Sequence, residues 1–444
     1  MLSTLPLSRA RQAELTSRQT ALLWLKRGIW AYIVLVLIEG ALRKWVLPGL
    51  ATPLLVIRDP LALWLIVRAW QQGYLRSNPY LSAMVLIGIV GTFTAVLVGH
   101  GSLPVAVYGA RILLLHFPLI FIIGRLFSHD DVLKLGLLML WISLGMTILI
   151  ALQFYSPQSA WVNRGVGGDT SGSGFSGALD RFRPSGTFSF TNGVTHFYGL
   201  LASFLLYFWF QPREVPKWLL AAATVCLLLA IPLSISRALF FQVGVAVLFS
   251  LVVFTRKPQY VRQLIMAVGV FTVLFVAVKD APFFEDVTGA FFNRFEAANE
   301  VEGGVKGVLG DRYLGGFLKA LKGSGQTPFW GHGLGMGTNV GSMLLSGGTT
   351  FIISEEEWGR VIGELGPLLG LALIVVRLSL CANLALRSYR LLGRNEILPW
   401  MLLSFALVIV PQAQWAQPTS LGFSTIIAGI LLAAVRYDKS TIPA

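Results

Sequence analysis

Charged residues are scarce in this chain, and their scarcity limits the class of protein it can be. Asp, Glu, Lys and Arg make up 13% of the 444 residues, and the mean hydropathy is +0.70. Soluble domains carry about 25% charged residues, so this composition excludes an ordinary soluble domain. Inside a bilayer only helices and closed barrels satisfy their backbone hydrogen bonds. The long apolar runs lack a period of two, which predicts helices.

Cysteine and histidine are also rare, with two and five copies. Cys226 and Cys381 fall inside apolar runs, which is typical of buried free thiols. This set excludes a disulfide framework and a Cys/His metal pattern. We therefore expect neither a metal site nor a cofactor.

The apolar runs predict an all-α polytopic membrane protein with about twelve membrane helices and a large, partly helical extracytoplasmic loop. The predicted spans cover residues 28–42, 51–68, 80–99, 104–124, 132–152, 192–210, 216–234, 238–255, 261–279, 358–378, 397–414 and 418–435. They divide the chain into three regions. Residues 1–279 form an N-terminal membrane region, which includes an outer loop at 153–191. Residues 280–357 form an extracytoplasmic loop, and residues 358–444 form a C-terminal membrane region.

Lys and Arg predict the orientation of these spans, because short basic connections stay on the cytoplasmic side. Basic and non-basic connections alternate along the chain, which puts both termini in the cytoplasm and both long loops outside. The N-terminal stretch is polar and basic and runs into a full span, as in an uncleaved anchor. The net charge of +14 is spread over short connections, so nucleic-acid binding is not expected.

The first long loop offers arginines beside a turn. Its first part, Gly165-Val-Gly-Gly-Asp-Thr-Ser-Gly-Ser-Gly, is rich in Gly and Ser and is expected to be flexible. Arg181 and Arg183 then flank a turn at Pro184 and Gly186, just before the next helix. Arginines near a helix N-terminus can form an anion site. They can equally be the interfacial arginines that commonly end a span.

The second long loop is acidic, with ten Asp or Glu against five Lys or Arg. Residues 284–295 and 311–323 have helical apolar spacing, and the phenylalanine face of the first is expected on the membrane surface or against the spans. The glycine-rich segment 331–339 is a weak phosphate-loop candidate, because no strand precedes it, and tight turns are the better interpretation. His332 within it is a lone histidine with no evident catalytic partner.

Ionisable residues inside predicted spans are functional candidates by default. These are Glu39, Arg58, Asp59, Arg111, Arg237 and Glu364. Arg58 and Asp59 can neutralise each other locally. Arg237 differs, because it ends Pro232-Leu-Ser-Ile-Ser-Arg at the outer tip of a helical hairpin, where a fixed cation suits an anionic lipid head group.

The triple glutamate Glu355, Glu356 and Glu357 ends the second loop. A carboxylate whose pKa is raised by a like-charged neighbour can deprotonate a hydroxyl. The alternative is an acidic helix start stabilised by the helix dipole. Arg183 and Arg237, with Arg181, Arg294, Arg312 and Arg360, supply guanidinium groups on the same predicted face, and such groups bind phosphate bidentately.

Four segments make the chain resemble the O-antigen ligase and polymerase superfamily of bacterial polysaccharide assembly. They are Arg183-Pro-Ser-Gly-Thr-Phe-Ser-Phe-Thr-Asn, Ser234-Ile-Ser-Arg-Ala, Asp311-Arg-Tyr with Pro328-Phe-Trp-Gly-His-Gly-Leu-Gly, and Glu364-Leu-Gly-Pro-Leu-Leu-Gly-Leu. Each is loose, but their order and the span pattern are more specific. Ligases of this family carry a His-Asn pair shortly before the glutamate of the last motif. The corresponding position here, nine residues before Glu364, is Glu355, which favours the polymerase branch.

The resemblance implies a metal-independent, inverting glycosyltransferase of the bacterial inner membrane. Its donor would be an oligosaccharide on undecaprenyl pyrophosphate and its acceptor a second glycan, with membrane lipids and possible chain-length regulators as partners. Arg183 and Arg237, assisted by Arg181, Arg312 and Arg360, would hold the pyrophosphate. Glu355, Glu356 or Glu357 would activate the acceptor hydroxyl.

Two alternatives stay open at this point. A ligase would transfer the glycan to a lipid or protein instead of extending it. A transporter or flippase would keep its charges near the bilayer midplane, with broken helices in matched halves. Here most candidate residues fall at the outer surface and no internal repeat is evident.

Overall fold

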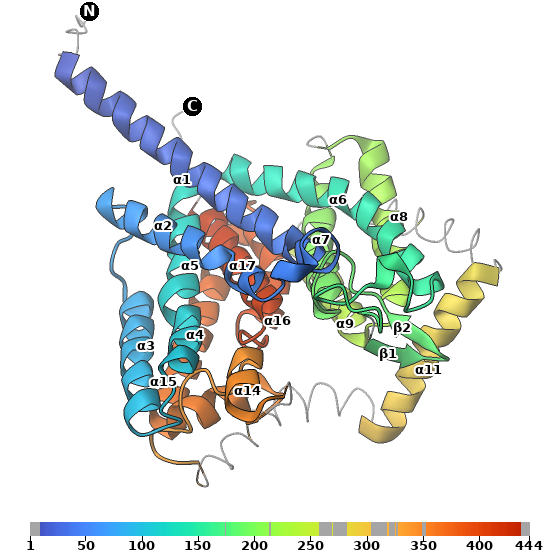
Figure 1. The fold of residues 1–444 in the computed structure, drawn as a ribbon. Helices are drawn as coiled ribbons and strands as arrows, with labels where there is room; N and C mark the ends of the chain where they lie inside the picture. Colours follow the sequence, from blue (N-terminus) through green and yellow to red (C-terminus); the bar gives the residue numbers. More distant parts are fainter. Residues whose placement is uncertain are drawn as a thin grey trace, which may run out of the picture.

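The structure is a computed structural model that describes residues 9–173, 175–212, 215–256, 282–302, 327–348 and 352–436, with the single residues 269, 318 and 325. It is a bundle of helices with one small hairpin (Figure 1). Within the described ranges, eight helices are long and apolar enough to cross a membrane. The predicted class, a helical membrane protein, therefore agrees with the structure.

The elements follow the sequence in this order. The helices are α1 (Arg9–Ala41), α2 (Arg58–Gln71), α3 (Pro79–Leu97), α4 (Leu103–Arg111), α5 (Phe117–Leu126), α6 (His129–Tyr155), α7 (Asn192–Phe210), α8 (Lys217–Leu233), α9 (Arg237–Arg256), α11 (Pro282–Glu302), α14 (Asn339–Ser346), α15 (Glu357–Gly393), α16 (Leu398–Ile409) and α17 (Pro418–Arg436). The strands are β1 (Phe175–Ala178) and β2 (Arg181–Arg183). Short π or 3-10 turns lie at Leu42–Val46, Pro48–Leu50, Pro53–Val56, Ile112–His116 and Trp161–Asn163.

Several predicted spans coincide with helices to within a few residues. The spans predicted at 80–99, 132–152 and 192–210 are α3, α6 and α7. Two shorter apolar helices, α8 and α16, match the spans predicted at 216–234 and 397–414. The predicted span 261–279, the amphipathic stretch 311–323 and the candidate Arg312 lie outside the described residues.

Side-chain contacts show which residues lie together at each end of the helix bundle. At one end Lys26 of α1 pairs with Asp131 at the start of α6, where Ser128 and Asp131 form a capping box. Arg436 at the end of α17 donates to the carbonyl of Phe127 at the same end. At the other end Arg43 donates to Ser189 Oγ. Arg43 lies seventeen residues after Lys26, in the π turn that continues α1, which corresponds to a rise of about 26 Å along the helix, close to the ~30 Å of a hydrocarbon core.

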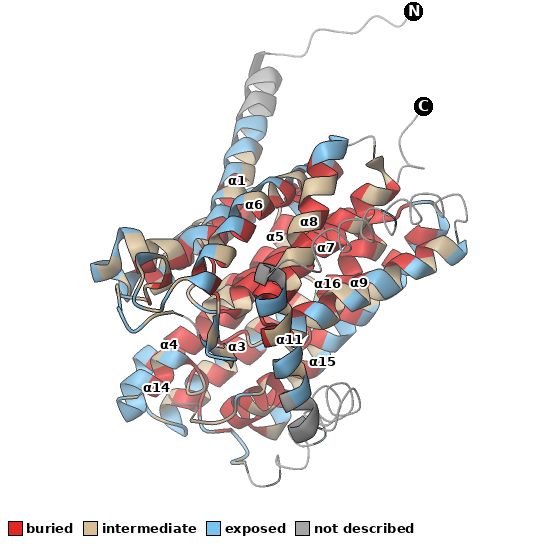
Figure 2. Ribbon diagram, turned by 90° about the vertical axis from the view of Figure 1, so that its right-hand side faces the viewer, coloured by how far each residue is buried: buried red, intermediate tan, exposed pale blue. Residues whose placement is uncertain are grey.

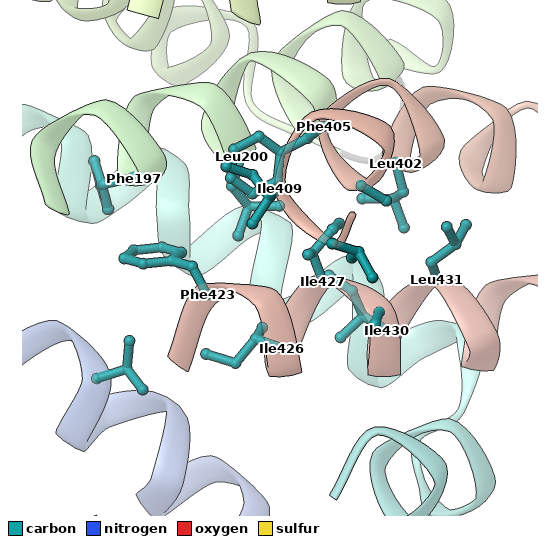
Figure 3. Packing of buried hydrophobic residues seen from close by; sticks show 14 of the residues in the cluster. Phe197, Leu200, Leu402, Phe405, Ile409, Phe423, Ile426, Ile427, Ile430 and Leu431 are labelled. Atoms are coloured by element: carbon teal, nitrogen blue, oxygen red, sulfur yellow. The ribbon is translucent and has the colours of Figure 1, made fainter. Parts of the chain in front are cut away.

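The core lies around α17, which is buried along almost its whole length. Figure 3 shows Phe423 and Ile427 of α17 facing side chains of α7 and α16, whereas Ile426 points away from them. On its other side α17 approaches α5 closely, because a Cβ on Gly429 would lie 2.7 Å from Ile123 Cβ. Small residues allow such close approach where lipid offers no hydrophobic driving force. Figure 2 shows the burial falling off toward the outer helices.

The chain reverses inside α15, which corrects the predicted straight span at 358–378. Glu357 Oε1 accepts from Arg377 Nη1 at 2.6 Å, although a straight helix would separate these residues by about 30 Å. The reversal occurs at Gly366, whose φ of +75° suits glycine, followed by Pro367, which has no N–H to donate. A short buried helix, 357–365, therefore folds back on the long one.

The glycine-rich segment 331–335 completes this reversal. The carbonyls of Gly363 and Glu364 accept hydrogen bonds from the amides of His332 (2.8 Å) and Gly333 (3.0 Å). A Cβ on Gly331 would lie 2.4 Å from the Glu364 carbonyl oxygen. The segment thus forms tight backbone turns, as the sequence predicts, and it satisfies carbonyls that the break at Gly366 and Pro367 leaves without a helical partner.

The first long loop holds a structure that the sequence analysis did not predict. β1 and β2 pair in antiparallel register, with Phe175 opposite Arg183, and a bulge interrupts the pairing between Ser176 and Ala178. Leu179 and Asp180 form the two-residue turn, both with positive φ. That is the turn geometry that matches strand twist, so residues 175–183 form a hairpin that the sequence pattern did not indicate.

The helix predicted from the phenylalanine spacing at 284–295 is present as α11. Val287 and Phe291 are buried, and Phe291 and Phe295 contact the ring of Phe240 on α9. The apolar face of α11 therefore packs on the membrane helices, which was one of the two expected placements.

The charges inside the spans are paired, though not with their sequence neighbours. Arg58 Nε lies 2.8 Å from Glu39 Oε2 on α1. Asp59 accepts from Arg111 at 2.9 Å and lies 2.9 Å from His116 Nε2. The expected local neutralisation of Arg58 by Asp59 is therefore wrong, because successive residues of a helix point about 100° apart.

Candidate functional site

A cavity of about 680 Å³ opens at the end of the bundle that carries Arg43. Six parts of the chain surround it: the hairpin, the connection from β2 to α7, the start of α9, α11, the start of α15, and the end of α16 with its connection to α17. Apolar side chains, among them Phe175, Phe190, Phe241 and Val245, line part of it. The polar part of the lining is dominated by arginine, glutamate and glutamine.

Three arginines from three separate elements meet in the cavity: Arg183 of β2, Arg237 of α9 and Arg294 of α11. Burial, together with the positive charges of Arg294 and Arg237, lowers the pKa of Arg183 to about 10. Arg183 Nε is buried and has no hydrogen-bond partner within the described part of the chain. A protein that gathers guanidinium groups in this way creates a strong site for an anion, phosphate above all.

Arg237 is held by a strained turn. Ile235 connects α8 to α9 with φ of +46°, which is rare for a β-branched residue and costs roughly 1–3 kcal/mol. Ser236 Oγ then accepts from the amide of Leu239 at 3.3 Å and caps α9. Gly177 of the hairpin packs against Ile235 so closely that a Cβ would lie 2.7 Å from Ile235 Cδ1. The strain thus fixes Arg237 and a helix N-terminus at the cavity wall.

Arg294 is tied to the hairpin as well. Its Nη1 donates to the carbonyl oxygen of Gly177 at 3.0 Å. One guanidinium group thereby links α11, the bulge of the hairpin and the cavity. From the sequence, Arg294 is one of the outer cations but is not assigned to the site. No sequence spacing connects it to the hairpin residues, which lie more than a hundred positions earlier in the chain.

The triple glutamate lies across the cavity from these arginines. Glu355 is exposed, Glu356 is half-buried and forms the N-cap position of α15, and Glu357 is buried. All three border the cavity. The carbonyl oxygen of Glu355 accepts from Gln414, which holds this segment beside the α16–α17 connection.

Glu357 is committed to a buried ion network of four residues, with Arg360, Glu364 and Arg377. Its two carboxylate oxygens accept from Arg360 Nε and Nη2, both at 2.9 Å, and from Arg377 Nη1. Arg360 Nη1 also donates to Glu364 Oε2 at 2.7 Å, and the amide of Gly337 donates to Glu364 Oε1 at 2.8 Å. Three guanidinium hydrogen bonds therefore hold the Glu357 carboxylate in the ion network, whereas the carboxylates of Glu355 and Glu356 have no ion pair to a described residue.

Two of the arginines expected at the pyrophosphate do not line the cavity. Arg181 lies two residues before Arg183 in the chain, and its Nη2 pairs with Asp286 Oδ2 at 3.1 Å. Arg360 is buried in the ion network. Arg312 lies outside the described residues.

Four glutamines that line the cavity were not among the predicted site residues. Gln242 comes from α9, and Gln412, Gln414 and Gln417 come from the connection between α16 and α17. The signal for the last three is visible in the sequence as Pro411-Gln-Ala-Gln-Trp-Ala-Gln-Pro418, an amide-rich break between two apolar runs. Amide side chains both donate and accept hydrogen bonds, which suits a ligand rich in hydroxyl groups.

The fold and this cavity define a polytopic helical membrane protein with an arginine-rich site at one end of its bundle. Comparison of the chain with protein-family models and with curated sequences finds no match.

Proposed function

We propose that this protein is a membrane glycosyltransferase that polymerises undecaprenyl-pyrophosphate-linked glycan repeats at the outer face of the bacterial cytoplasmic membrane. The observation that carries the proposal is the meeting of Arg183, Arg237 and Arg294 with Glu355 and Glu356 in one cavity. A lipid pyrophosphate matches the arginines, a sugar chain matches the glutamines, and the apolar wall suits the start of a polyprenyl tail.

The proposed reaction is an inverting displacement. The acceptor hydroxyl oxygen forms a bond to the anomeric carbon of the donor while the bond from that carbon to the pyrophosphate oxygen breaks. Glu355 or Glu356 takes the hydroxyl proton, which contributes roughly 10²–10⁴ in rate when the base is well placed. Undecaprenyl pyrophosphate leaves with the bonding electron pair, and Arg183, Arg237 and Arg294 stabilise its growing negative charge.

The sharpest test uses two arginines of the same strand. Arg183 borders the cavity, whereas Arg181 pairs with Asp286 away from it. Purified protein in liposomes would receive a synthetic undecaprenyl-pyrophosphate oligosaccharide repeat. Longer glycans on the lipid and release of undecaprenyl pyrophosphate would be measured by chromatography.

We expect Arg183→Lys and Arg237→Lys each to lower chain extension by roughly 10²–10³, because a point charge replaces a bidentate donor at the leaving group. Arg181→Lys should stay within about threefold of the native rate, as expected for an exposed ion pair. Equal losses in all three variants would reject the assigned arginines. Transfer of the glycan only to an added lipid or protein acceptor would identify a ligase instead.

The proposal includes a topology of twelve crossings with both termini in the cytoplasm. It adds α2, α8, α16 and the predicted span at 261–279 to the eight apolar helices. The test is labelling of a cysteine introduced at Gly325 in intact cells. A membrane-impermeant reagent should reach it from the outside, and labelling only after the inner leaflet is opened would contradict the orientation.

A further inference from the structure

A second cavity, of about 330 Å³, lies at the opposite end of the bundle from the cavity with the glutamates. Arg18 of α1, Arg76 of the α2–α3 connection and Arg125 of α5 line it, together with residues 71–74. None of its described lining residues is acidic. Its position is fixed by Arg436, whose guanidinium donates to the carbonyls of Arg125 and Phe127 and closes the end of α5.

The local structure directs these side chains into one space. Gly73 follows the C-cap of α2 and has φ of +69°, and the amides of Gly73 and Tyr74 donate to the carbonyls of Trp70 (3.0 Å) and Ala69 (2.8 Å). The turn brings Tyr74 and Arg76 back beside the ends of α2 and α5. Neither Arg76 nor Arg125 has a side-chain hydrogen bond or ion pair to a residue that the structure describes.

Aromatic side chains place this cavity at the level of lipid head groups. Trp70 of α2 is 70% exposed and Trp24 of α1 is 56% exposed, and both lie near the cavity along their helices. Exposed tryptophans gather at the membrane–water interface. Basic pockets between helices at that level bind the phosphates of anionic lipids.

We propose that Arg76 and Arg125, with Arg18, bind the phosphate of an anionic phospholipid head group. The chemistry that they recognise is a phosphate group. The neighbouring exposed tryptophans favour a lipid over free phosphate as its source. This inference does not depend on the proposed glycosyltransferase activity, because it concerns the other end of the bundle.

The experiment is native mass spectrometry of the purified full-length protein in detergent. The probes are dioleoyl phosphatidylglycerol, dioleoyl phosphatidylcholine and inorganic phosphate. The test variant is Arg76→Gln/Arg125→Gln. The matched control is Arg387→Gln/Arg390→Gln, which removes the same charge from exposed positions of α15 outside this cavity.

We expect the native protein and the control to retain phosphatidylglycerol in preference to phosphatidylcholine. The test variant should bind phosphatidylglycerol about 25-fold more weakly, from roughly fivefold per arginine. Equal retention by the test and control variants would overturn the site. Competition by inorganic phosphate at millimolar concentration, without a preference for phosphatidylglycerol, would overturn the lipid assignment.

The single variant Arg76→Gln guards against loss of folding, because Arg76 is exposed and lies between helices. It should unfold at the native temperature in lipid-free detergent and bind phosphatidylglycerol about fivefold more weakly. A native affinity in this folded variant would also count against the site.

Discussion

The buried ion network and the arginine cavity share a border at the start of α15, yet they handle charge differently. In the network Glu357 and Glu364 balance Arg360 and Arg377, and each carboxylate accepts from a guanidinium group at 2.9 Å or less. In the cavity Arg183, Arg237 and Arg294 gather with one another, and Arg183 keeps a buried Nε without a partner in the described chain. The first arrangement stabilises a fold and the second is suited to an incoming anion.

Residues that are adjacent in the sequence can therefore have different roles in the structure. Glu356 and Glu357 are neighbours with the same chemistry, but only Glu357 points into the protein. Glu356 has an extended backbone at the N-cap position, whereas Glu357 is the first helical residue, so their side chains leave the chain in different directions. The reversal at Gly366 then brings Arg377 to the inward-pointing carboxylate.

Substitution of Glu355 or Glu356 should have the largest effect on activity. We expect Glu355→Gln or Glu356→Gln, whichever residue is the base, to lower the rate of chain extension roughly 10²–10⁴-fold. Donor binding and thermal unfolding should stay unchanged. Gln keeps the size of the side chain but cannot take the proton. The measurements are chain extension in liposomes and retention of the lipid-linked donor. If both variants extend glycan at the native rate, the cluster is only the acidic start of a helix.

Glu357→Gln should lower the stability of the protein, in contrast to substitution of Glu355. Removing the charge leaves Arg360 and Arg377 buried without their common partner, and breaking a buried pair costs about 3–5 kcal/mol. We expect a clearly lower unfolding temperature in detergent, with Glu355→Gln as the control that unfolds like the native protein. Native stability of Glu357→Gln would show that the network does not hold the start of α15.

The smallest expected effect is on folding stability, which the mutual repulsion of the three cavity arginines lowers. Burial beside Arg294 and Arg237 lowers the pKa of Arg183 from its usual value to about 10, so the charged form of Arg183 destabilises the ligand-free fold at neutral pH. The free energy of unfolding therefore rises as the pH increases above about 10. Arg183→Gln relieves this repulsion at neutral pH. We expect the unfolding temperature of ligand-free protein to rise by about 2 °C.

The same unfolding temperatures would then be measured with added inorganic pyrophosphate. Pyrophosphate should stabilise the native protein and Arg181→Gln but not Arg183→Gln, because Arg183 lines the cavity and Arg181 does not. A lower unfolding temperature for ligand-free Arg183→Gln would indicate that this arginine stabilises the fold, against the proposed role.

Much of the helical framework could be predicted from the sequence. The periodicity and length of the apolar runs located α3, α6 and α7 to within a few residues, since a bilayer demands internally bonded helices of a set length. The phenylalanine spacing located α11 in the same way. Arg183, Arg237 and the glutamates were selected because polar residues at the ends of apolar runs are conspicuous.

The hairpin and the reversal of α15 could not be predicted in this way. The turn at Leu179 and Asp180 contains no glycine, although both residues adopt positive φ. Gly366-Pro367 indicates a break, but its sharpness depends on the glycine segment at 331–333, which supplies amides from a distant part of the chain. Both features follow from contacts across the fold.

The amino-acid sequence alone indicates a helical membrane protein with arginines near the outer ends of several spans, because hydration and backbone hydrogen bonding act locally along the chain. Which charges meet depends on the tertiary structure. It joined Arg294 to Arg183 and Arg237, turned Arg181 and Arg360 away, and paired Glu357 with Arg377. Charges interact through space over a few ångströms, and spacing in the sequence carries little information about such distances once the helices have packed.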